Sequence, residues 1–258
     1  MTTPEPLSTT PTPPPDAELT PVDLLVVGAH PDDAEYGMGG TLLVHARAGR
    51  RIGVVDLTRG ELGSKGDPQR RAREAAHAAQ LYDASWRVCL DLGDNQVEAD
   101  PDAARLLARV IRAARPRVVC THHHVDRHPD HRAAHELVRR AVFAAALRAL
   151  DLGAEHHVVA ATLCFPTDGV LERPDVVVDV TDVWEARLET MRRFTSQFDA
   201  PTLEIDRTHY GVDDYLEVTA ARARVHGQHA GVRHAEAFVA DRPPRAADLV
   251  ALFAPGGG

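Results

Sequence analysis

Apolar runs alternate with helix-forming segments along the first 150 residues of the chain. Short runs rich in Val, Leu and Ile predict buried strands at residues 22–27, 51–57, 86–90 and 117–121. Segments with apolar residues at helical spacing predict helices at 37–49, from 68 to about 82, at 101–115, and after 131 to about 150. Four strand–helix repeats in a row predict a parallel sheet with helices on both faces.

The pattern changes after residue 150. We expect further strands at residues 157–163 and 176–180, and helices at 183–194 and 213–226. No linker rich in Pro, Gly or Ser separates the two halves, so we interpret these elements as extensions of the same sheet. The predicted fold class is therefore α/β, a Rossmann-like, doubly wound and mostly parallel sheet forming a single domain over residues 21–258. Residues 1–20 are rich in Pro and Thr, which predicts a disordered tail.

Two polar clusters follow the first and the fourth predicted strands. His30, Asp32 and Asp33 come directly after the first strand, and His128 and His131 come after the fourth. In a doubly wound sheet with strand order 3-2-1-4-5, strands one and four are neighbours, and ligands bind in the crevice beyond their carboxyl ends. The sequence therefore predicts one site at the C-terminal ends of these two strands.

The residue types in the two clusters indicate a metal site. Two adjacent carboxylates beside a buried strand repel each other unless a cation offsets their charge. We expect the ligands to be His30, Asp33 and His131, with Zn²⁺ as the first choice and Fe²⁺ as the alternative, because such a set leaves one position for water or substrate. Asp32 can then move a proton to and from the reacting groups. His128 can polarise a carbonyl or, as a charged imidazole, stabilise an oxyanion.

Other interpretations of these polar residues carry less weight. A single His-x-x-Asp is common in proteins, and the metal site becomes the favoured interpretation only when both clusters lie together. For His122, His123 and His124 we expect a solvated loop or packing at a strand end, and Asp94 is consistent with a turn. A dinucleotide site lacks its glycines and would place two carboxylates against phosphate. A serine hydrolase lacks the Gly-x-Ser-x-Gly turn.

The composition of the chain limits which binding partners and which cell compartment we expect. A net charge of −9 argues against nucleic acid, whose affinity for proteins comes largely from Lys and Arg. No apolar run approaches the roughly 20 residues that span a bilayer, and the N-terminus has no signal-peptide core. The three cysteines are far apart and lie in apolar runs, which predicts buried, reduced thiols. We therefore expect a cytoplasmic protein with a small-molecule substrate.

The two motifs together also resemble a known family. Residues 29–35, Ala-His-Pro-Asp-Asp-Ala-Glu, and residues 128–131, His-Pro-Asp-His, are similar to the motifs of the LmbE-like (PIG-L) zinc-dependent N-deacetylases. The resemblance runs from about Val22 into the 240s. The segments 56–58, 126–131, 196–198, 231–232 and 235–238 further resemble the branch that deacetylates N-acetylglucosaminyl-malate in bacillithiol biosynthesis.

The resemblance implies a role for each matching residue. It places zinc on His30, Asp33 and His131, makes Asp32 the general base, and lets His128 assist at the oxyanion. It also implies that Arg71 and Arg127 contact substrate and that Asp94 binds a sugar hydroxyl. Arginine suits the two carboxylates of malate, although a surface helix charge is the alternative for Arg71.

The same resemblance implies a hydrolase of linear amide bonds that forms a homo-oligomer, and it favours a hexamer. Its substrate would be a sugar conjugate, with the malate conjugate first. The alternatives are an inositol-linked or oligosaccharide conjugate of N-acetylglucosamine and, from another class of protein, a metal-binding or sugar-binding module without catalysis.

Overall fold

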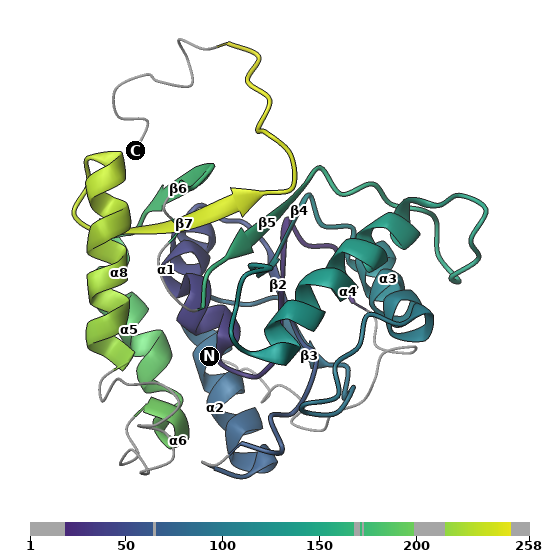
Figure 1. Ribbon diagram of the computed structural model, residues 1–258, viewed down its shortest axis with the longest axis horizontal. Helices are drawn as coiled ribbons and strands as arrows, with labels where there is room; N and C mark the ends of the chain where they lie inside the picture. The colour runs from purple at the N-terminus through teal and green to yellow at the C-terminus, as the bar shows by residue number, and fades with distance from the viewer. Residues whose placement is uncertain (1–18, 64–65, 168–170, 172, 199–214, 249–258) are drawn as a thin grey trace, which may run out of the picture.

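The fold was analysed in a computed structural model (Figure 1). The structure describes residues 19–63, 66–167, 171, 173–198 and 215–248. The predicted tail at residues 1–20 therefore lies, apart from its last two residues, outside the described part of the chain.

Seven strands form the central sheet in the order β3-β2-β1-β4-β5-β7-β6. Their bounds are β1 Leu24–Gly28, β2 Ile52–Asp56, β3 Trp86–Cys89, β4 Val118–His122, β5 Ala161–Phe165, β6 Val176–Asp179 and β7 Ala235–Ala240. Strands β3, β2, β1, β4 and β5 are parallel to one another. The α/β class, the mostly parallel sheet and the order 3-2-1-4-5 of its first five strands are thus confirmed.

The far end of the sheet was not predicted in this form. Strand β7 was absent from the expected elements, and it lies between β5 and β6, antiparallel to both. The sheet therefore closes with a strand that returns from the end of the chain, whereas the sequence pattern had indicated only that later strands extend the sheet.

Helices cover both faces of the sheet. They are α1 Asp33–Arg47, α2 Pro68–Leu81, α3 Pro101–Ala114, α4 Pro129–Ala146, α5 Trp184–Arg192 after the 3-10 turn Thr181–Val183, α6 Thr195–Phe198 and α8 Tyr215–Ala230. One core lies between the sheet and α3 and α4, and the other between the sheet and α1, α5 and α8 (Figure 1). None of these described helices has the length and the apolar character that a membrane crossing would need.

Strand β1 shows why this chain forms a two-faced sheet. All five of its residues are buried. Leu25 and Val27 belong to the core under α3 and α4, and Leu24 and Val26 belong to the core on the other face. Because side chains alternate along a strand, a continuous apolar run can fill both cores at once. The polar residues that follow β1 are therefore forced to the carboxyl edge of the sheet.

Candidate active site

The loops after β1 and β4 meet at this edge, as the strand order predicts. The ring centroids of His30 and His128 lie 4.8 Å apart, those of His128 and His131 lie 4.7 Å apart, and those of His30 and His131 lie 5.5 Å apart. Helix α4 fixes His131 in its first turn, and helix α1 begins at Asp33 rather than at the expected residue 37. The two clusters thus form one site.

Asp33 lies between the two predicted histidine ligands. Its Oδ2 is 3.4 Å from His30 Nδ1, and its Oδ1 is 3.4 Å from His131 Nε2. Two donor atoms of one zinc ion lie about 3.3–3.6 Å apart, so each contact has a suitable length, and the two contacts use different oxygens of Asp33. Ligand atoms of His30, His128 and His131 also lie within 4.8 Å of one another. The described residues therefore fit a divalent metal, and the ligand set stays a prediction.

Carboxylates hold the remote nitrogen of each predicted histidine ligand. His131 Nδ1 lies 3.1 Å from Asp126 Oδ2, which also accepts a hydrogen bond from Thr167 Oγ1. His30 Nε2 lies 3.2 Å from Asp94 Oδ1 and 3.3 Å from Asp130 Oδ2. A carboxylate on the outer nitrogen fixes the orientation of a metal-binding imidazole. Both rings are thus turned toward the space beside Asp33.

The electrostatics of this cluster indicate a need for positive charge. Burial alone lowers the pKa of His131, but Asp33 and Asp126 raise that pKa to about 9. In the same way Asp130, Asp33 and Asp94 outweigh burial and raise the pKa of His30 well above its usual value. Two protons can supply this charge, and one divalent cation can replace them.

Asp32 lies beside the cluster and faces a different partner. Its Oδ2 is 3.2 Å from a guanidinium nitrogen of Arg71, which also donates to the carbonyl oxygens of Gly60 and Pro31. Burial raises the pKa of Asp32 to about 7, although Arg71 opposes the shift. A carboxyl group with a pKa near neutrality can both accept and return a proton. Asp32 also has a backbone φ of 136°, which is strained for any residue except glycine.

Arg71 is buried rather than exposed, so the surface-charge interpretation of this residue is wrong. Its guanidinium is itself held by two backbone carbonyl oxygens and contacts Asp32, which makes it a positioning group for that carboxylate. Its predicted contact with substrate stays a prediction.

His128 presents one nitrogen to the pocket. Its Nδ1 accepts a hydrogen bond from the backbone N–H of Asp130 and caps helix α4. Burial, with the charges of His131 and His30, lowers the pKa of His128. A neutral imidazole whose Nδ1 accepts carries its proton on Nε2, so His128 can donate a hydrogen bond to a developing oxyanion without being charged.

The predicted substrate contacts lie in a common pocket. A cavity of about 510 Å³ is lined by Asp32, His128, Arg71, Asp94 and Arg127, together with the aromatic rings of Tyr36, Phe198 and Tyr215. Both oxygens of Asp94 already have partners, since Oδ1 faces His30 and Oδ2 accepts from the Leu62 N–H. The sugar contact of Asp94 stays a prediction, and its contact with His30 is a function that the sequence analysis did not assign.

His122 and Asp126 are two residues whose place in the site the sequence analysis missed. His122 packs at a strand end as one interpretation expected, but it is fully buried, stacks on His131 at 4.0 Å and lies 3.1 Å from Asp33. Burial lowers the pKa of His122 to about 4, which keeps the ring neutral and able to bind a metal. A signal for Asp126 was present, because metal-binding histidines usually have a carboxylate partner.

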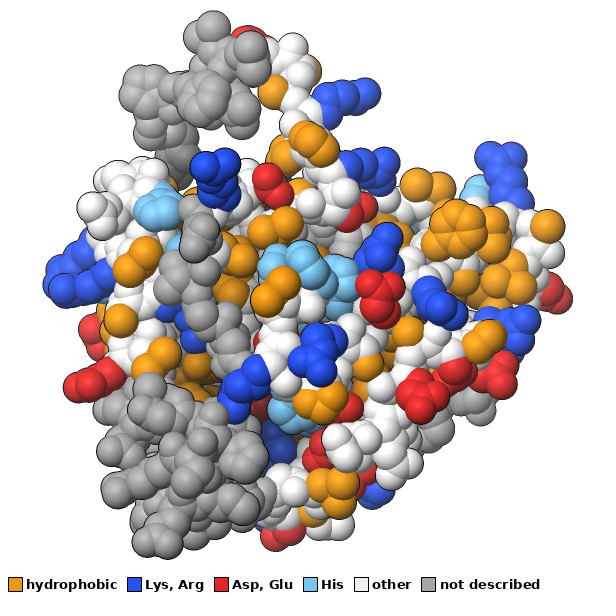
Figure 2. Space-filling view, viewed as in Figure 1, with side chains coloured by type: hydrophobic (Ala, Val, Ile, Leu, Met, Phe, Trp, Pro, Cys, Tyr) orange, Lys and Arg blue, Asp and Glu red, His pale blue; other side chains and the backbone are white. Residues whose placement is uncertain are grey.

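The remaining expectations concern cysteines and surface charge. All three cysteines are free, and Cys120 and Cys164 are buried, as predicted. Burial raises the pKa of Cys89 and of Cys164 to about 12, so neither thiol ionises at neutral pH. On the face seen in Figure 2, acidic and basic side chains are interspersed, and histidine side chains gather near its centre.

A model of a known protein family matches the part of the chain that contains both motifs. The family model PIG-L, described as GlcNAc-PI de-N-acetylase, matches residues 25–142. The crystal structure of a conserved protein, TT1542, from Thermus thermophilus superposes with a TM-score of 0.79 at 34% sequence identity. That superposition covers 88% of this chain and 98% of the other.

Three relatives differ in what their names say they act on. Diacetylchitobiose deacetylase of Thermococcus kodakarensis is 28% identical over 83% of this chain and 80% of its own length. The 4-oxalmesaconate hydratase of Pseudomonas putida is 30% identical over 67% of this chain and 73% of its own length. A Bacillus subtilis protein named "Probable N-acetyl-alpha-D-glucosaminyl L-malate deacetylase 2" is 25% identical over 71% of this chain and 86% of its own length. Relatives with 25–30% identity to this chain are therefore named for two different reactions, deacetylation and hydration.

Proposed function

Because the chain belongs to the PIG-L (LmbE-like) family, we propose that it is a hydrolase that removes the acetyl group from an N-acetylglucosamine conjugate. One observation carries the proposal: Asp32 lies beside the His30–Asp33–His131 donor set but is held by Arg71, outside that set. A module that only bound metal or sugar would have no use for such a carboxylate.

The chain's own residues divide the work of amide hydrolysis. Asp32 accepts a proton from the attacking water as the carbon–oxygen bond forms. His128 donates a hydrogen bond from Nε2 to the oxyanion of the tetrahedral intermediate. Asp32 then gives the proton to the nitrogen of the glucosamine as the carbon–nitrogen bond breaks, which releases acetate and a free amine. Arg71 keeps Asp32 in place through both transfers.

The cofactor in this proposal is zinc, with Fe²⁺ as the alternative. His30, Asp33 and His131 would hold it, and mixed nitrogen and oxygen ligands suit either ion. A divalent ion at this position lowers the pKa of water and polarises a carbonyl group. Asp126, Asp94 and Asp130 would keep the two imidazoles oriented toward it.

For the substrate we propose N-acetylglucosaminyl-malate, the bacillithiol precursor. Support comes from the segments that resemble this branch and from the name of the Bacillus subtilis relative. Arg127 lines the pocket, and an arginine there suits a malate carboxylate. Arg71 contacts Asp32, so a malate contact made by Arg71 would be shared with that carboxylate. The inositol conjugate and diacetylchitobiose are the alternatives.

The test is a side-by-side assay of the metal-loaded protein. Free amine and acetate are measured with the malate conjugate, the inositol conjugate and diacetylchitobiose, and hydration is measured with 4-oxalmesaconate. We expect stoichiometric amine and acetate, with the highest kcat/KM for the malate conjugate. Faster turnover of another conjugate would change the proposed substrate. Hydration without amine release would overturn the proposed deacetylase activity.

The remaining expectations complete the proposal. Residues 21–258 form a single catalytic domain, and the protein works in the cytoplasm as a homo-oligomer, with a hexamer as the expected state. Light scattering on the purified protein measures its mass directly. A monomer at working concentration would contradict this part without affecting the chemistry.

A further inference from the structure

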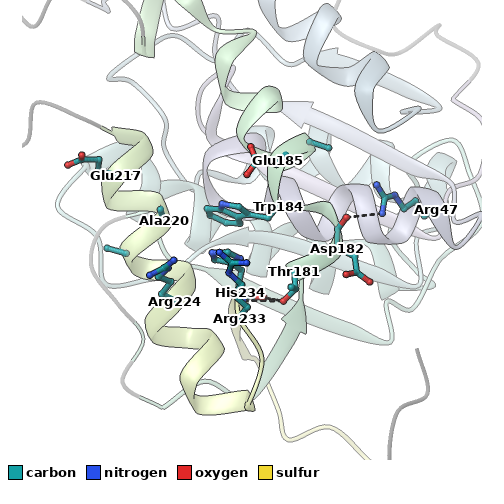
Figure 3. A pocket seen from close by; sticks show the side chains of 12 residues that line it. Arg47, Thr181, Asp182, Trp184, Glu185, Glu217, Ala220, Arg224, Arg233 and His234 are labelled. Atoms are coloured by element: carbon teal, nitrogen blue, oxygen red, sulfur yellow. Dashed lines mark hydrogen bonds between the residues drawn. The ribbon is translucent and has the colours of Figure 1, made fainter.

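A second cavity lies away from the candidate active site, between α5, α8 and the turn that leads into β7 (Figure 3). Its volume is about 760 Å³, and among the described residues none lines both this cavity and the catalytic pocket. The proposed deacetylation therefore gives this cavity no role.

The floor of the cavity is a stack of two rings. Trp184, at the start of α5, and His234, before β7, lie 4.2 Å apart with an angle of 11° between their planes. Both are buried, with 9% and 4% of their surfaces exposed. His234 Nδ1 has no hydrogen-bond partner among the described residues. Buried polar atoms are almost always paired, so an imidazole with an unpaired buried nitrogen is unusual in a residue that also lines a cavity.

Two arginines flank His234. Arg224 projects from α8 and Arg233 from the turn before β7, and both line the cavity beside the imidazole (Figure 3). Neither guanidinium makes an ion pair or hydrogen bond with another described residue. Burial, and then the charges of Arg233 and Arg224, lower the pKa of His234, so the ring between them is neutral.

Two of the three arginines that line the cavity lie at the His234 end. Arg47 donates to the carbonyl oxygen of Asp182 at another part of the rim. Glu185 lies on the far side of Trp184 from His234 in Figure 3. A ligand that pairs with both arginines beside His234 needs an anionic group, while the acidic residues Asp182, Glu185 and Glu217 elsewhere in the lining disfavour further negative charge.

We propose that Arg224, Arg233 and His234 bind the phosphate group of a small phosphate-bearing molecule. Arg224 comes from α8, and Arg233 and His234 come from the turn before β7, so residues of two elements line the same end of the cavity. A phosphate offers three or more acceptor oxygens in a tetrahedral arrangement, whereas one arginine already satisfies the two oxygens of a carboxylate. The site is independent of the proposed deacetylation and would be present in the full chain whatever its substrate is.

The experiment is a calorimetric titration of the full, metal-loaded chain with inorganic phosphate. Potassium chloride keeps the ionic strength constant, because screening alone weakens exposed charges. We expect saturable binding that falls about tenfold or more in the double variant Arg224→Ala/Arg233→Ala. The matched control Arg105→Ala/Arg139→Ala removes two exposed arginines from α3 and α4 and should bind phosphate like the wild type.

Two further measurements locate the binding. His234→Phe keeps the stack on Trp184 but removes the ring nitrogens, and it should weaken phosphate binding several-fold. Acetate in place of phosphate distinguishes a tetrahedral anion from a carboxylate, and we expect acetate to bind more weakly. Absence of saturable binding would overturn the proposal. Unchanged binding in the double variant would also overturn it, because the phosphate would then occupy another site.

Discussion

Two groups of buried charges lie on the same sheet and are balanced in different ways. At the carboxyl edge of β1 and β4, Asp33, Asp126 and Asp130 surround His30 and His131 at 3.1–3.4 Å. Each imidazole there must be protonated or must bind a cation to balance the carboxylates. The chain alone leaves negative charge in excess at this edge.

The buried ion pair between Arg187 and Glu236 is balanced entirely by groups of the protein. Arg187 on α5 donates to Glu236 on β7 at 3.1 Å, and Glu236 also accepts the N–H groups of Gly40 and Thr41 at 2.9 and 2.7 Å. These N–H groups follow a break in α1 at Met38. Glu236 thus caps the second half of that helix, and no ligand is needed. The contrast indicates that buried charge balanced by the chain is structural, and that charge left unbalanced marks the functional site.

The largest expected effect is on catalysis at the unbalanced edge. Asp32→Asn should lower kcat by about 10²–10⁴-fold, because an amide cannot carry the proton between water and the leaving amine. Asparagine has the size and shape of aspartate and adds no backbone strain to what aspartate already bears, so the backbone and the metal content should be retained. Steady-state kinetics with metal analysis measures both. Asp102→Asn, an exposed change on α3, is the control, and wild-type turnover in Asp32→Asn would refute the assigned role.

The next effect is on stability at the balanced pair. Arg187→Met should reduce the free energy of unfolding by about 3–5 kcal/mol, because Glu236 would stay buried without its counter-charge. Chemical denaturation measures this change. The double variant Arg187→Met/Glu236→Gln should recover part of the loss. If the single variant were as stable as the wild type, the distinction between the two groups of charges would fail.

A smaller effect should appear around the predicted ligands. Asp126→Asn removes the charge behind His131, and we expect metal affinity to fall about 10–100-fold while the fold persists. Competition with a chelator of known affinity measures it. Unchanged affinity would mean that Asp126 serves only to shape the loop through its contacts with Thr167 and the N–H of His128.

The smallest effect concerns pH and a histidine outside both groups. Burial, with Arg222 and His229, lowers the pKa of His226 from 6.5 to about 4, and its Nε2 accepts from the Leu171 N–H. Below pH 6.5 the unfolded chain binds a proton here that the folded chain does not. The free energy of unfolding should therefore fall, by about 2 kcal/mol, as the pH drops from about 6.5 to 4. In His226→Gln this slope should flatten, and an unaltered slope would contradict the assignment.

The first half of the fold could be predicted because its signals are local. Each strand from β1 to β4 is an apolar run, α2, α3 and α4 each begin at a proline after a capping residue, and the strand order is that of a doubly wound sheet. Strand β7 could not be predicted in this way. Its residues pair with Leu163 and Cys164, far back in the chain, and with β6 on the other side. Such pairing depends on tertiary contacts that no local pattern contains.

The residues of the candidate site could likewise be predicted only in part. The convergence of His30, Asp33 and His131 follows from strand order, so the sequence predicts it. The partners of their outer nitrogens depend on side-chain directions, so Asp126 and the contact between Asp94 and His30 were missed. Arg71 was recognised only through family resemblance, because a helix position alone does not tell whether an arginine is buried.

The strained backbone of Asp32 sets a cost that only the reaction justifies. Glycine would adopt the same φ without penalty, so the aspartate carries a conformational cost. Replacing it with glycine would also leave the buried guanidinium of Arg71 without its counter-charge. A laboratory library sorted for heat resistance alone would therefore weigh a relaxed backbone against an unpaired arginine at this one position.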